Sequence, residues 1–451
     1  MSREATQPLP FSYAQGDGWV RTGRVTECRA LSLVVRIWGA CPGHVIEIDA
    51  GPTAIHAEVC EVRGEEAVCV PIERPDQVRV GATARCDGAR LGAYCGPGLL
   101  GRCVDAWGRG ADEAACQVQS RTPRPLALSE RRRVSAKLTT GIAAIDALCT
   151  IGKGQRIALF SGAGVGKSTL LRRIAEHALL DAHVVALIGE RGREAAEAAA
   201  ELRSSPAWDT TTLVCATADA SPRERFAAAT TALAQAEWLC DRGMDVLLTV
   251  DSLTRVANAW RETALATGEP AAHRGYPASM VGALASLVER AGARPTGSIT
   301  GIFAVLVDGD DPFEPVTDTV RGLLDGHIVL SRRLSEAGRY PPIDALRSSS
   351  RLMRSLVPAA HAADAALVRK ALAALERAED LFAIGAYRPG GDPELDAAVA
   401  QRSRIDDFLF QAETTSAQSL DQLSDIGTSL RVAPRCGDGV RDTGGHNRRG
   451  A

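Results

Sequence analysis

The residues best suited to chemistry form a short glycine-rich run with one lysine and two hydroxyls. Residues 160–169 read Phe-Ser-Gly-Ala-Gly-Val-Gly-Lys-Ser-Thr and lie between an apolar, strand-like segment and a helix-like one. Glycines let consecutive backbone N–H groups turn towards phosphate oxygens, a lysine adds positive charge, and a hydroxyl can bind Mg²⁺. The run therefore predicts a phosphate-binding P-loop that consists of Gly162, Gly164, Val165, Gly166, Lys167 and Ser168, with Ser168 as a ligand of the metal.

This run departs from the usual P-loop pattern at one position. The pattern has glycine five residues before Gly166, where this chain has Ser161. A Gly-Lys-Ser sequence that falls in a loop by chance is the alternative for such a match taken alone. The other polar residues near the predicted site must decide between the two.

A carboxylate after a second apolar strand supplies the other half of a magnesium site. Asp251 follows the run Val246–Val250, so it should emerge at the carboxyl edge of a parallel sheet, where nucleotide sites of open α/β folds form. An aspartate there can instead cap the following helix. Because a P-loop precedes it in the same βαβ region, we expect Asp251 to act on Mg²⁺ through its water shell.

Hydrolysis also needs a group that orients or deprotonates the attacking water. Glu190 is the best candidate, because it follows the predicted strand Val184–Ile188, one strand beyond the P-loop helix. The alternative is a charged surface turn that opens a helix. Glu194 suits that alternative better than Glu190, since a carboxylate is favourable near a helix N-terminus.

A parallel sheet covered by helices on both faces must position these side chains. From Thr140 onward, apolar strand-like segments alternate with alanine-rich helical ones, which is the pattern of an α/β domain. The predicted strands are 156–160, 184–188, 212–216, 246–250 and 298–307, and the predicted helices include 194–203 and 223–240.

The segments on either side of this core have other patterns. Short β-rich pieces with Gly, Pro and Asp turns predict a small β-barrel domain, and segments 362–378 and 396–420 predict a helical C-terminal domain. The predicted division is a flexible arm at 1–20, the barrel at 21–115, the P-loop α/β domain at 116–355, the helical domain at 356–430, and a disordered, arginine-bearing tail at 431–451.

Composition argues against several other classes of protein. The chain has 451 residues, 45% apolar and 24% charged, as in ordinary globular proteins. A formal charge of −3 argues against nucleic acid as a partner. The 12 cysteines include no Cys-x-x-Cys pair, and no apolar run approaches the ~20 residues that span a bilayer. We therefore expect a cytoplasmic protein with unpaired thiols.

The order of these motifs resembles the catalytic-subunit family of rotary ATPases and, within it, the type III secretion ATPases of bacterial flagella and injectisomes. Secretion ATPases often carry a small residue other than glycine where Ser161 stands. The resemblance runs from about Arg24 to Gln411 and implies a RecA-like P-loop core between an N-terminal β-barrel and a C-terminal helical domain. Besides the P-loop, it rests on residues 140–146, 154–156, 189–194, 251–255, 268–270, 274–277, 324–332 and 340–344.

The resemblance also implies roles around the phosphates. Lys167 would contact the β- and γ-phosphates, and Thr169 the α-phosphate side. Glu190 would polarise the attacking water, with Arg191 and Arg255 as supporting charges.

Two residues further along the chain gain roles only from the resemblance. Tyr340 matches the aromatic residue that packs on adenine, a contact that needs only a π-face. Arg351, in a Ser-Ser-Ser-Arg sequence, matches the arginine finger that completes the neighbouring subunit's site. A plain surface arginine is the alternative for Arg351.

An arginine supplied by a neighbour implies a ring, and the family is hexameric. The partners implied are a stator protein at the N-terminal arm, a central stalk at residues 392–396, chaperone-bound effectors or other export substrates, and a secretion gate at the membrane. The protein would then be cytoplasmic and peripheral to the inner membrane, and would use Mg²⁺ with ATP as substrate.

The function expected is Mg²⁺-dependent ATP hydrolysis at the base of a type III secretion apparatus, which drives chaperone release and unfolding of export substrates. Residues 385–387 and 391–393 are typical of flagellar members, whereas the P-loop resembles injectisome forms, which we favour. The alternatives are a catalytic subunit of a proton-translocating rotary synthase, a ring-shaped RNA translocase, and a nucleotide-binding regulator without turnover. An RNA translocase should have stacking aromatics on its barrel, but residues 24–113 hold only Trp38, Tyr94 and Trp107.

Overall fold

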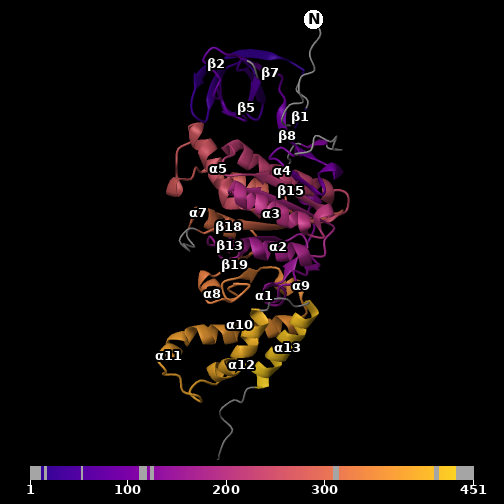
Figure 1. Cartoon of the computed structure of the whole chain (residues 1–451), viewed down its shortest axis with the longest axis vertical. Coiled ribbons are helices and arrows are strands. Elements are labelled where there is room, and N and C mark those ends of the chain that lie inside the picture. The colour runs from indigo at the N-terminus through magenta and orange to yellow at the C-terminus, as the bar shows by residue number, and fades with distance from the viewer. Residues whose placement is uncertain are drawn as a thin grey trace, which may run out of the picture.

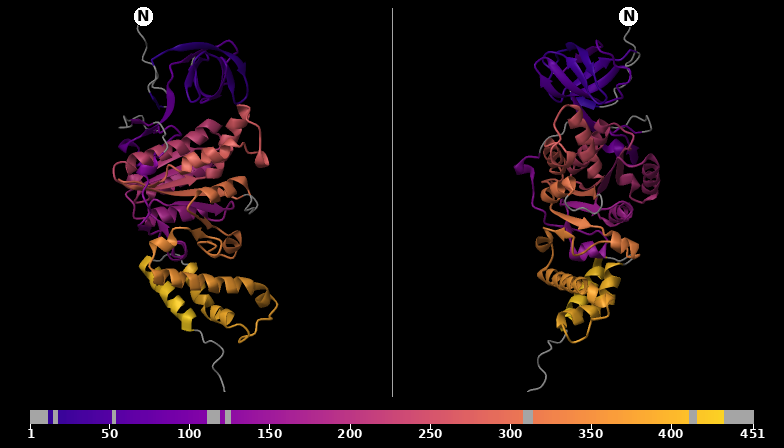
Figure 2. Two further views of the ribbon diagram at one scale, coloured as in Figure 1. Left: turned by 180° about the vertical axis from the view of Figure 1, so that it is seen from behind. Right: turned by 90° about the vertical axis from the view of Figure 1, so that its left-hand side faces the viewer.

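The computed structural model describes residues 12–14, 18–51, 54–110, 119–121, 126–307, 314–410 and 416–432. Three parts follow one another along the longest axis of the molecule, namely a β-barrel, a layered α/β sheet and a group of helices (Figure 1). The barrel and the C-terminal helices lie at opposite ends of the sheet in both views of Figure 2. The predicted fold class, an α/β P-loop core with an N-terminal β-barrel and a C-terminal helical domain, is confirmed.

Six antiparallel strands close the barrel in the order β2-β3-β6-β5-β4-β7. Side chains of the strands alternate between interior and solvent, as a barrel wall requires. In β4, for example, Ile46 and Ile48 are buried while Glu47 and Asp49 are exposed. The bounds are β2 Arg21–Cys28, β3 Leu33–Arg36, β4 Val45–Asp49, β5 Ala54–Arg63, β6 Glu66–Pro71 and β7 Thr83–Cys86.

Short strands connect the barrel to the rest of the molecule. Strand β8 (Arg90–Cys95) pairs with β1 (Ser12–Ala14) and β10 (Gln119–Arg121), so part of the predicted arm is a strand. Strand β9 (Arg102–Val104) lies within the predicted barrel range but pairs in parallel with β15 of the central sheet. The described residues also include the short 3₁₀ helices η1 Pro97–Leu99, η2 Leu128–Glu130, η3 Trp208–Thr210 and η4 His273–Gly275.

The central sheet has the order β20-β19-β13-β18-β16-β14-β15-β9, with the short β17 paired to β18. All neighbours run parallel except those of β17 and β20. Each predicted strand is present, with ends shifted by no more than two residues. The bounds are β13 Arg156–Ser161, β14 Ala182–Ile188, β15 Thr211–Ala216, β16 Asp245–Asp251, β17 Gly292–Ala293, β18 Ser298–Leu306, β19 Gly326–Val329 and β20 Ser349–Ser350; β11 Lys137–Leu138 and β12 Ile151–Gly152 form a separate pair.

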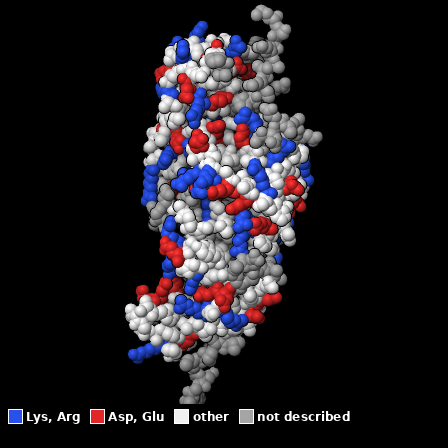
Figure 3. All heavy atoms as spheres, in the orientation of Figure 1, with Lys and Arg blue, Asp and Glu red and all other residues white. Residues whose placement is uncertain are grey.

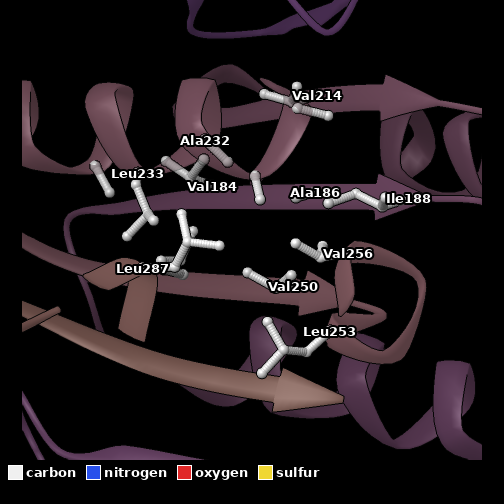
Figure 4. Packing of buried hydrophobic residues seen from close by; sticks show 14 of the residues in the cluster. Val184, Ala186, Ile188, Val214, Ala232, Leu233, Val250, Leu253, Val256 and Leu287 are labelled. Carbon is white, nitrogen blue, oxygen red and sulfur yellow. The ribbon is translucent and has the colours of Figure 1, made fainter. Parts of the chain in front are cut away.

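Helices cover both faces of this sheet, which explains why its strands are apolar almost throughout. In β13, Ala158 and Phe160 belong to the core under one layer of helices, and Ile157 and Leu159 to the core under the other. Figure 4 shows the first core, with side chains of β14 and β16 packed against helices α4 and α5. That layer is α4 Pro222–Cys240, α5 Leu253–Ala266, α6 Ser279–Val288 and α7 Pro315–Leu323; the other includes α1 Ala143–Leu148 and α2 Lys167–His177, and α3 Gly192–Ser204 packs beside β15.

The C-terminal helices correct one detail of the sequence prediction. A single helix over 396–420 is wrong, because α12 ends at Leu409 and α13 begins at Ser416. Folding back lets α13 bury Leu423 and Ile426 in the same core as α10. Helix α13 also includes Arg431 and Val432 of the predicted tail, whose remaining residues lie outside the described ones. The bounds are α8 Arg332–Glu336, α9 Met353–Leu356, α10 Ala359–Arg377, α11 Glu379–Ala383, α12 Pro393–Leu409 and α13 Ser416–Val432.

Two further properties concern the described residues. None of their helices is long and apolar enough to cross a membrane. Ten cysteines lie among them, and five of the ten are buried: Cys69, Cys86, Cys95, Cys149 and Cys240.

A glycine in α13 makes the packing of the C-terminal helices testable. A Cβ atom at Gly427 would collide with the carboxylate of buried Asp364 in α10, which pairs with Arg431 at 2.6 Å. We expect Gly427→Ala to lower the free energy of unfolding by roughly 1–3 kcal/mol through overpacking, despite the better helix propensity of alanine. Gly282→Ala in α6 is the matched control, since its Cβ would meet nothing within 4 Å. Chemical denaturation measures both, and equal effects would contradict the packing argument.

Candidate active site

The glycine-rich run forms a loop between the carboxyl end of β13 and the N-terminus of α2. Gly164 and Gly166 have φ values of 75° and 94°, a backbone conformation that favours glycine. Val165 is buried in the core and anchors the loop there. Ser168 and Thr169 are exposed in the first turn of α2. Backbone N–H groups and the positive end of α2 thus surround a space suited to phosphate.

The structure explains why serine is acceptable at position 161. Ser161 is still a strand residue, paired with Leu306 of β18, and does not have the positive φ that calls for glycine. Its side chain is 1% exposed, and within the described part of the chain its Oγ has no hydrogen-bond partner. A small residue therefore fits at this position.

Three predicted residues come together at the carboxyl edge of the sheet. The Lys167 Nζ contacts Asp251 Oδ1 directly and lies 3.7 Å from Glu190 Oε1. Asp251 ends β16 and is level with Leu187 of the neighbouring β14, three residues before Glu190. The Glu190 carbonyl accepts a hydrogen bond of 2.9 Å from the Ala218 amide. Parallel pairing of neighbouring strands therefore brings both carboxylates to one cation.

The environment of Glu190 matters for its chemistry. Burial raises the pKa of Glu190, Lys167 opposes this rise, and the nearby charges of Asp251 and Arg255 act in opposite directions. Arg255 packs against Gly189, where a Cβ atom would lie 2.9 Å from the arginine Cβ. The result is a half-buried carboxyl group that holds a proton more readily than a free one, as a water-activating group requires.

Arg191 lies away from this cluster. Its side chain is 83% exposed at the N-cap of α3, and its one ion pair among the described residues is with Glu194, at 3.6 Å. Glu194 itself lies in the first turn of α3, where its charge suits the helix end. Arg255, rather than Arg191, is the arginine whose charge acts on Glu190 here.

The oxygens at this edge fit a magnesium ion. Mg²⁺ takes hard oxygen ligands and keeps several waters, so a hydroxyl and one or two carboxylates are sufficient protein contacts. Ser168 exposes its hydroxyl at the start of α2, and the Asp251 carboxylate is buried beside Lys167. A bound Mg²⁺ would neutralise phosphate charge, and Asp251 would exchange its contact with Lys167 for the water shell of the ion.

Tyr340 lies on the other side of the P-loop. A Cβ atom at Gly166 would lie 3.9 Å from Tyr340 Cε1, so the ring stands beside the loop. The side chain is 52% exposed, and its hydroxyl lies 3.1 Å from Ser335 Oγ. A cavity of about 690 Å³ extends from Phe160 and Gly162 to Val329 and Arg333, at the ends of β13 and β19.

Arg351 lies at the amino edge of the sheet, whereas its own P-loop lies at the carboxyl edge. It follows β20, which runs antiparallel to β19 and pairs Ser350 with Gly326 at the amino end of that strand. Its amide bonds Asp325 O at 3.0 Å, and its Nη2 bonds Arg321 O at 3.2 Å. The P-loop begins on the order of 15 Å further along the sheet, and the Arg351 side chain is exposed to solvent.

Some residues that hold this geometry escaped the sequence analysis. Gln155 donates hydrogen bonds to Ser350 Oγ at 3.0 Å and to Asp325 O at 3.2 Å, which anchors the strand before Arg351. The sequence showed Gln155 only as part of a family motif. Arg369 lies in the alanine-rich helix α10 beside Lys370, and nothing in the sequence distinguished it from the other basic residues of that helix.

A P-loop at the end of a parallel strand, with a strand-end aspartate and a glutamate facing its lysine, defines a P-loop nucleoside triphosphatase. Residues 141–350 match the ATP synthase alpha/beta family nucleotide-binding domain, and residues 357–425 match the T3SS EscN ATPase C-terminal domain.

Relatives that match this chain over about nine-tenths of its length identify the family within this class of protein. The flagellum-specific ATP synthase of Treponema pallidum is 41% identical over 91% of this chain and 92% of its own length. The SPI-2 type 3 secretion system ATPase of Salmonella typhimurium is 39% identical over 92% and 96%. The assembled ATPase EscN of the enteropathogenic E. coli type III secretion system superposes with a TM-score of 0.85 at 37% identity, over 90% of this chain and all of EscN. The structure of EscN in complex with its central stalk EscO superposes on this chain with a TM-score of 0.81. This chain therefore belongs to the flagellar and type III secretion ATPase family and is an ATPase.

Proposed function

We propose that this chain forms a homohexameric ring that hydrolyses Mg²⁺-ATP at the cytoplasmic base of a type III secretion apparatus. The ring would drive the release of chaperones from export substrates and the unfolding of those substrates. The position of Arg351 carries this proposal. Arg351 is exposed at the amino edge of the sheet, so it does not contribute its charge to the phosphates in its own site. Head-to-tail contacts in a ring would bring it to the site of the next subunit.

Within each site, the proposed roles follow the geometry. Lys167 binds the β- and γ-phosphates, and the Thr169 hydroxyl lies on the α-phosphate side. Ser168 and Asp251 hold Mg²⁺, and Glu190 polarises the attacking water. Tyr340 packs on adenine, which its exposed ring beside the loop supports.

Two arginines supply supporting charge in this proposal. The effect of Arg255 on the pKa of Glu190 supports a role close to the water. Arg191 is exposed at the rim of the site, where its long side chain has freedom to turn towards a bound nucleotide.

The proposed partners follow from the arrangement of the parts. The EscN complex with EscO supports a central stalk, and we place its contact at the turn before α12. There Asp392 caps the helix, and Asp396 accepts hydrogen bonds from Tyr387 and the Gly390 amide. The stator contact is assigned to the N-terminal arm, most of which lies outside the described residues. Export substrates and a membrane gate complete the set, with the ring cytoplasmic and peripheral to the inner membrane.

Between the two export systems, we favour the injectisome on the sequence of the P-loop, while the relatives include both systems. A strain that lacks the chain should lose secretion of effector proteins and keep its motility. Loss of motility with normal effector secretion would assign the chain to a flagellum.

Three observations disfavour a rotary synthase subunit and an RNA translocase. The match of residues 357–425 to the EscN C-terminal domain favours an export ATPase over a rotary synthase subunit. Of the three aromatics in the predicted barrel segment, Trp107 is buried and Trp38 alone is largely exposed, at 79%. On the face shown in Figure 3, basic and acidic side chains are interspersed. Neither the aromatics of this segment nor the charges on that face support a stacking surface or a basic groove for RNA.

The rate of ATP hydrolysis against protein concentration tests the proposal. The specific activity of the purified chain alone should rise steeply over the concentrations at which native mass spectrometry detects hexamers, because each site needs its neighbour's arginine. Lys167→Ala should abolish activity at every concentration while the hexamer still forms. A specific activity that does not change with concentration would contradict the shared site, and activity that requires a second, noncatalytic subunit would favour the rotary synthase.

A further inference from the structure

Arg369 connects the C-terminal helices to the ATPase domain through a single guanidinium group. Its Nη1 donates to Ala345 O at 2.6 Å, and its Nη2 to Leu148 O at 2.9 Å and Ser348 O at 3.0 Å, with Cys149 Sγ at 3.1 Å. The acceptors belong to two separate parts of the ATPase domain. Leu148 and Cys149 end α1, whereas Ala345 and Ser348 lie in the segment that leads to β20.

In the proposed ring, the segment that leads to β20 connects two different nucleotide sites. Residues 340–351 begin with Tyr340, beside the P-loop of its own subunit, and end with Arg351. Within it, Ser348 Oγ accepts a hydrogen bond from the Val329 amide at 3.0 Å and donates one to Asp344 O at 2.6 Å. Ser348 is three residues before Arg351, and β20 lies between them. A shift at the Ser348 carbonyl therefore reaches Arg351 through one short, paired strand.

Helix α10 holds the same segment at a second point. Arg347 pairs with Glu376 of α10 at 3.3 Å and with Asp344 of its own segment. The Arg347–Glu376 pair is largely exposed, so it should stabilise the contact between α10 and this segment less than the part-buried Arg369 does. Helix α10 and residues 344–348 should thus move together.

A general adhesive role for Arg369 can be separated from a specific one. His361, two turns earlier on α10, also contacts the end of α1, with Nε2 2.8 Å from Ala147 O. Within the described part of the chain, His361 forms no hydrogen bond or ion pair with residues 340–351. Of these two α10 side chains, Arg369 alone bonds both the end of α1 and the segment before Arg351, and its planar guanidinium directs donors to four acceptors at once.

We propose that Arg369 is a positioning residue for Arg351, and that it couples the position of the C-terminal helices to hydrolysis in the neighbouring subunit's site. The inference rests on the proposed function, in which Arg351 acts in the next site. A contact that moves α10 displaces the carbonyls of Ala345 and Ser348 and with them Arg351. Misplacing a catalytic charge by ~1 Å costs about a hundredfold in rate, so a small movement of the helices is enough to switch the neighbouring site.

Kinetics of the full-length, assembled protein provide the first test. We expect Arg369→Ala and Arg369→Lys to lower kcat by about ten- to a hundredfold, with the KM for ATP and the hexamer unchanged. His361→Ala is the matched control, because it removes one bond between α10 and the end of α1 and should leave kcat within about twofold. An unchanged kcat in the folded Arg369→Lys hexamer, or an equal loss in His361→Ala, would overturn the proposal.

Mixed rings separate this inference from the proposed function. Lys167→Ala subunits have no working site, but they carry normal Arg351 and Arg369. Mixed with Arg369→Ala or with Arg351→Ala subunits, they should restore activity to up to roughly a quarter of wild type, as random assortment around a head-to-tail ring gives. Rescue of both variants supports the proposal. Rescue of Arg351→Ala alone overturns the role of Arg369 and leaves the shared site standing, whereas rescue of neither overturns the shared site and with it this inference.

Discussion

Replacing Arg351 with alanine should lower the kcat of the assembled ring by about 10³-fold or more, because an arginine finger contributes 10³ to 10⁵ in rate. Arg351 lies at the amino end of β19, away from its own P-loop, so the loss should not weaken ATP binding within the same subunit. Steady-state kinetics at a concentration where hexamers are confirmed measures the effect. Arg351→Lys should remain impaired, because a point charge does not replace the guanidinium fork.

The control for this experiment is Arg354→Ala. Arg354 is an exposed arginine three residues further on, in α9, so this variant makes the same change of net charge near the same surface. Its kcat should stay within about twofold of wild type, since a surface charge contributes little. Full activity of Arg351→Ala in a confirmed hexamer would show that the neighbour's arginine plays no part.

The second large effect is expected for Glu190→Gln. Glutamine keeps the size of the side chain but cannot accept the proton of the attacking water, so kcat should fall by about 10²- to 10⁴-fold. The change leaves Lys167, the proposed ligand of the phosphates, in place, so the affinity for ATP should change little. Single-turnover hydrolysis and titration with a fluorescent ATP analogue measure the two quantities separately.

A neighbouring glutamate provides the control for this variant. Glu194→Gln removes a charge four residues on, from a side chain that faces the exposed Arg191 at the start of α3. Its kcat should change by less than about threefold, because its charge serves mainly the helix end. Equal losses in both variants would mean that the local charge, and not the water-activating carboxylate, is what the reaction needs.

The sequence predicted the sheet and the core of the site for one physical reason. Strands covered on both faces must be apolar, so β14 and β16 stood out together with the polar residues that follow them. Because the carboxyl ends of parallel strands share one edge, Glu190 and Asp251 were expected near Lys167, and the structure places the three side chains in contact distance. Their catalytic roles remain predictions that the variants above test.

Contacts between residues far apart in the chain could not be predicted from the sequence. Strand β9 lies in a region with a barrel-like pattern yet joins the central sheet, since its partner β15 begins more than a hundred residues later. The break between α12 and α13 likewise depends on the packing of α13 against α10. Local propensity predicts neither the pairing of β9 nor the break between α12 and α13, because both depend on packing between distant parts of the chain.

By itself, then, the sequence determined the glycine-rich loop, the carboxylates at the strand ends and the three-part architecture, all of which follow from local pattern and strand direction. Only the tertiary structure decided that Ser161 is a strand residue with no need of glycine, that Arg351 lies at the far edge of the sheet, and that Arg369 holds the segment leading to it. The reason is that a loop binds phosphate with neighbouring residues, whereas the position of Arg351 is set by hydrogen bonds between residues that only folding brings together.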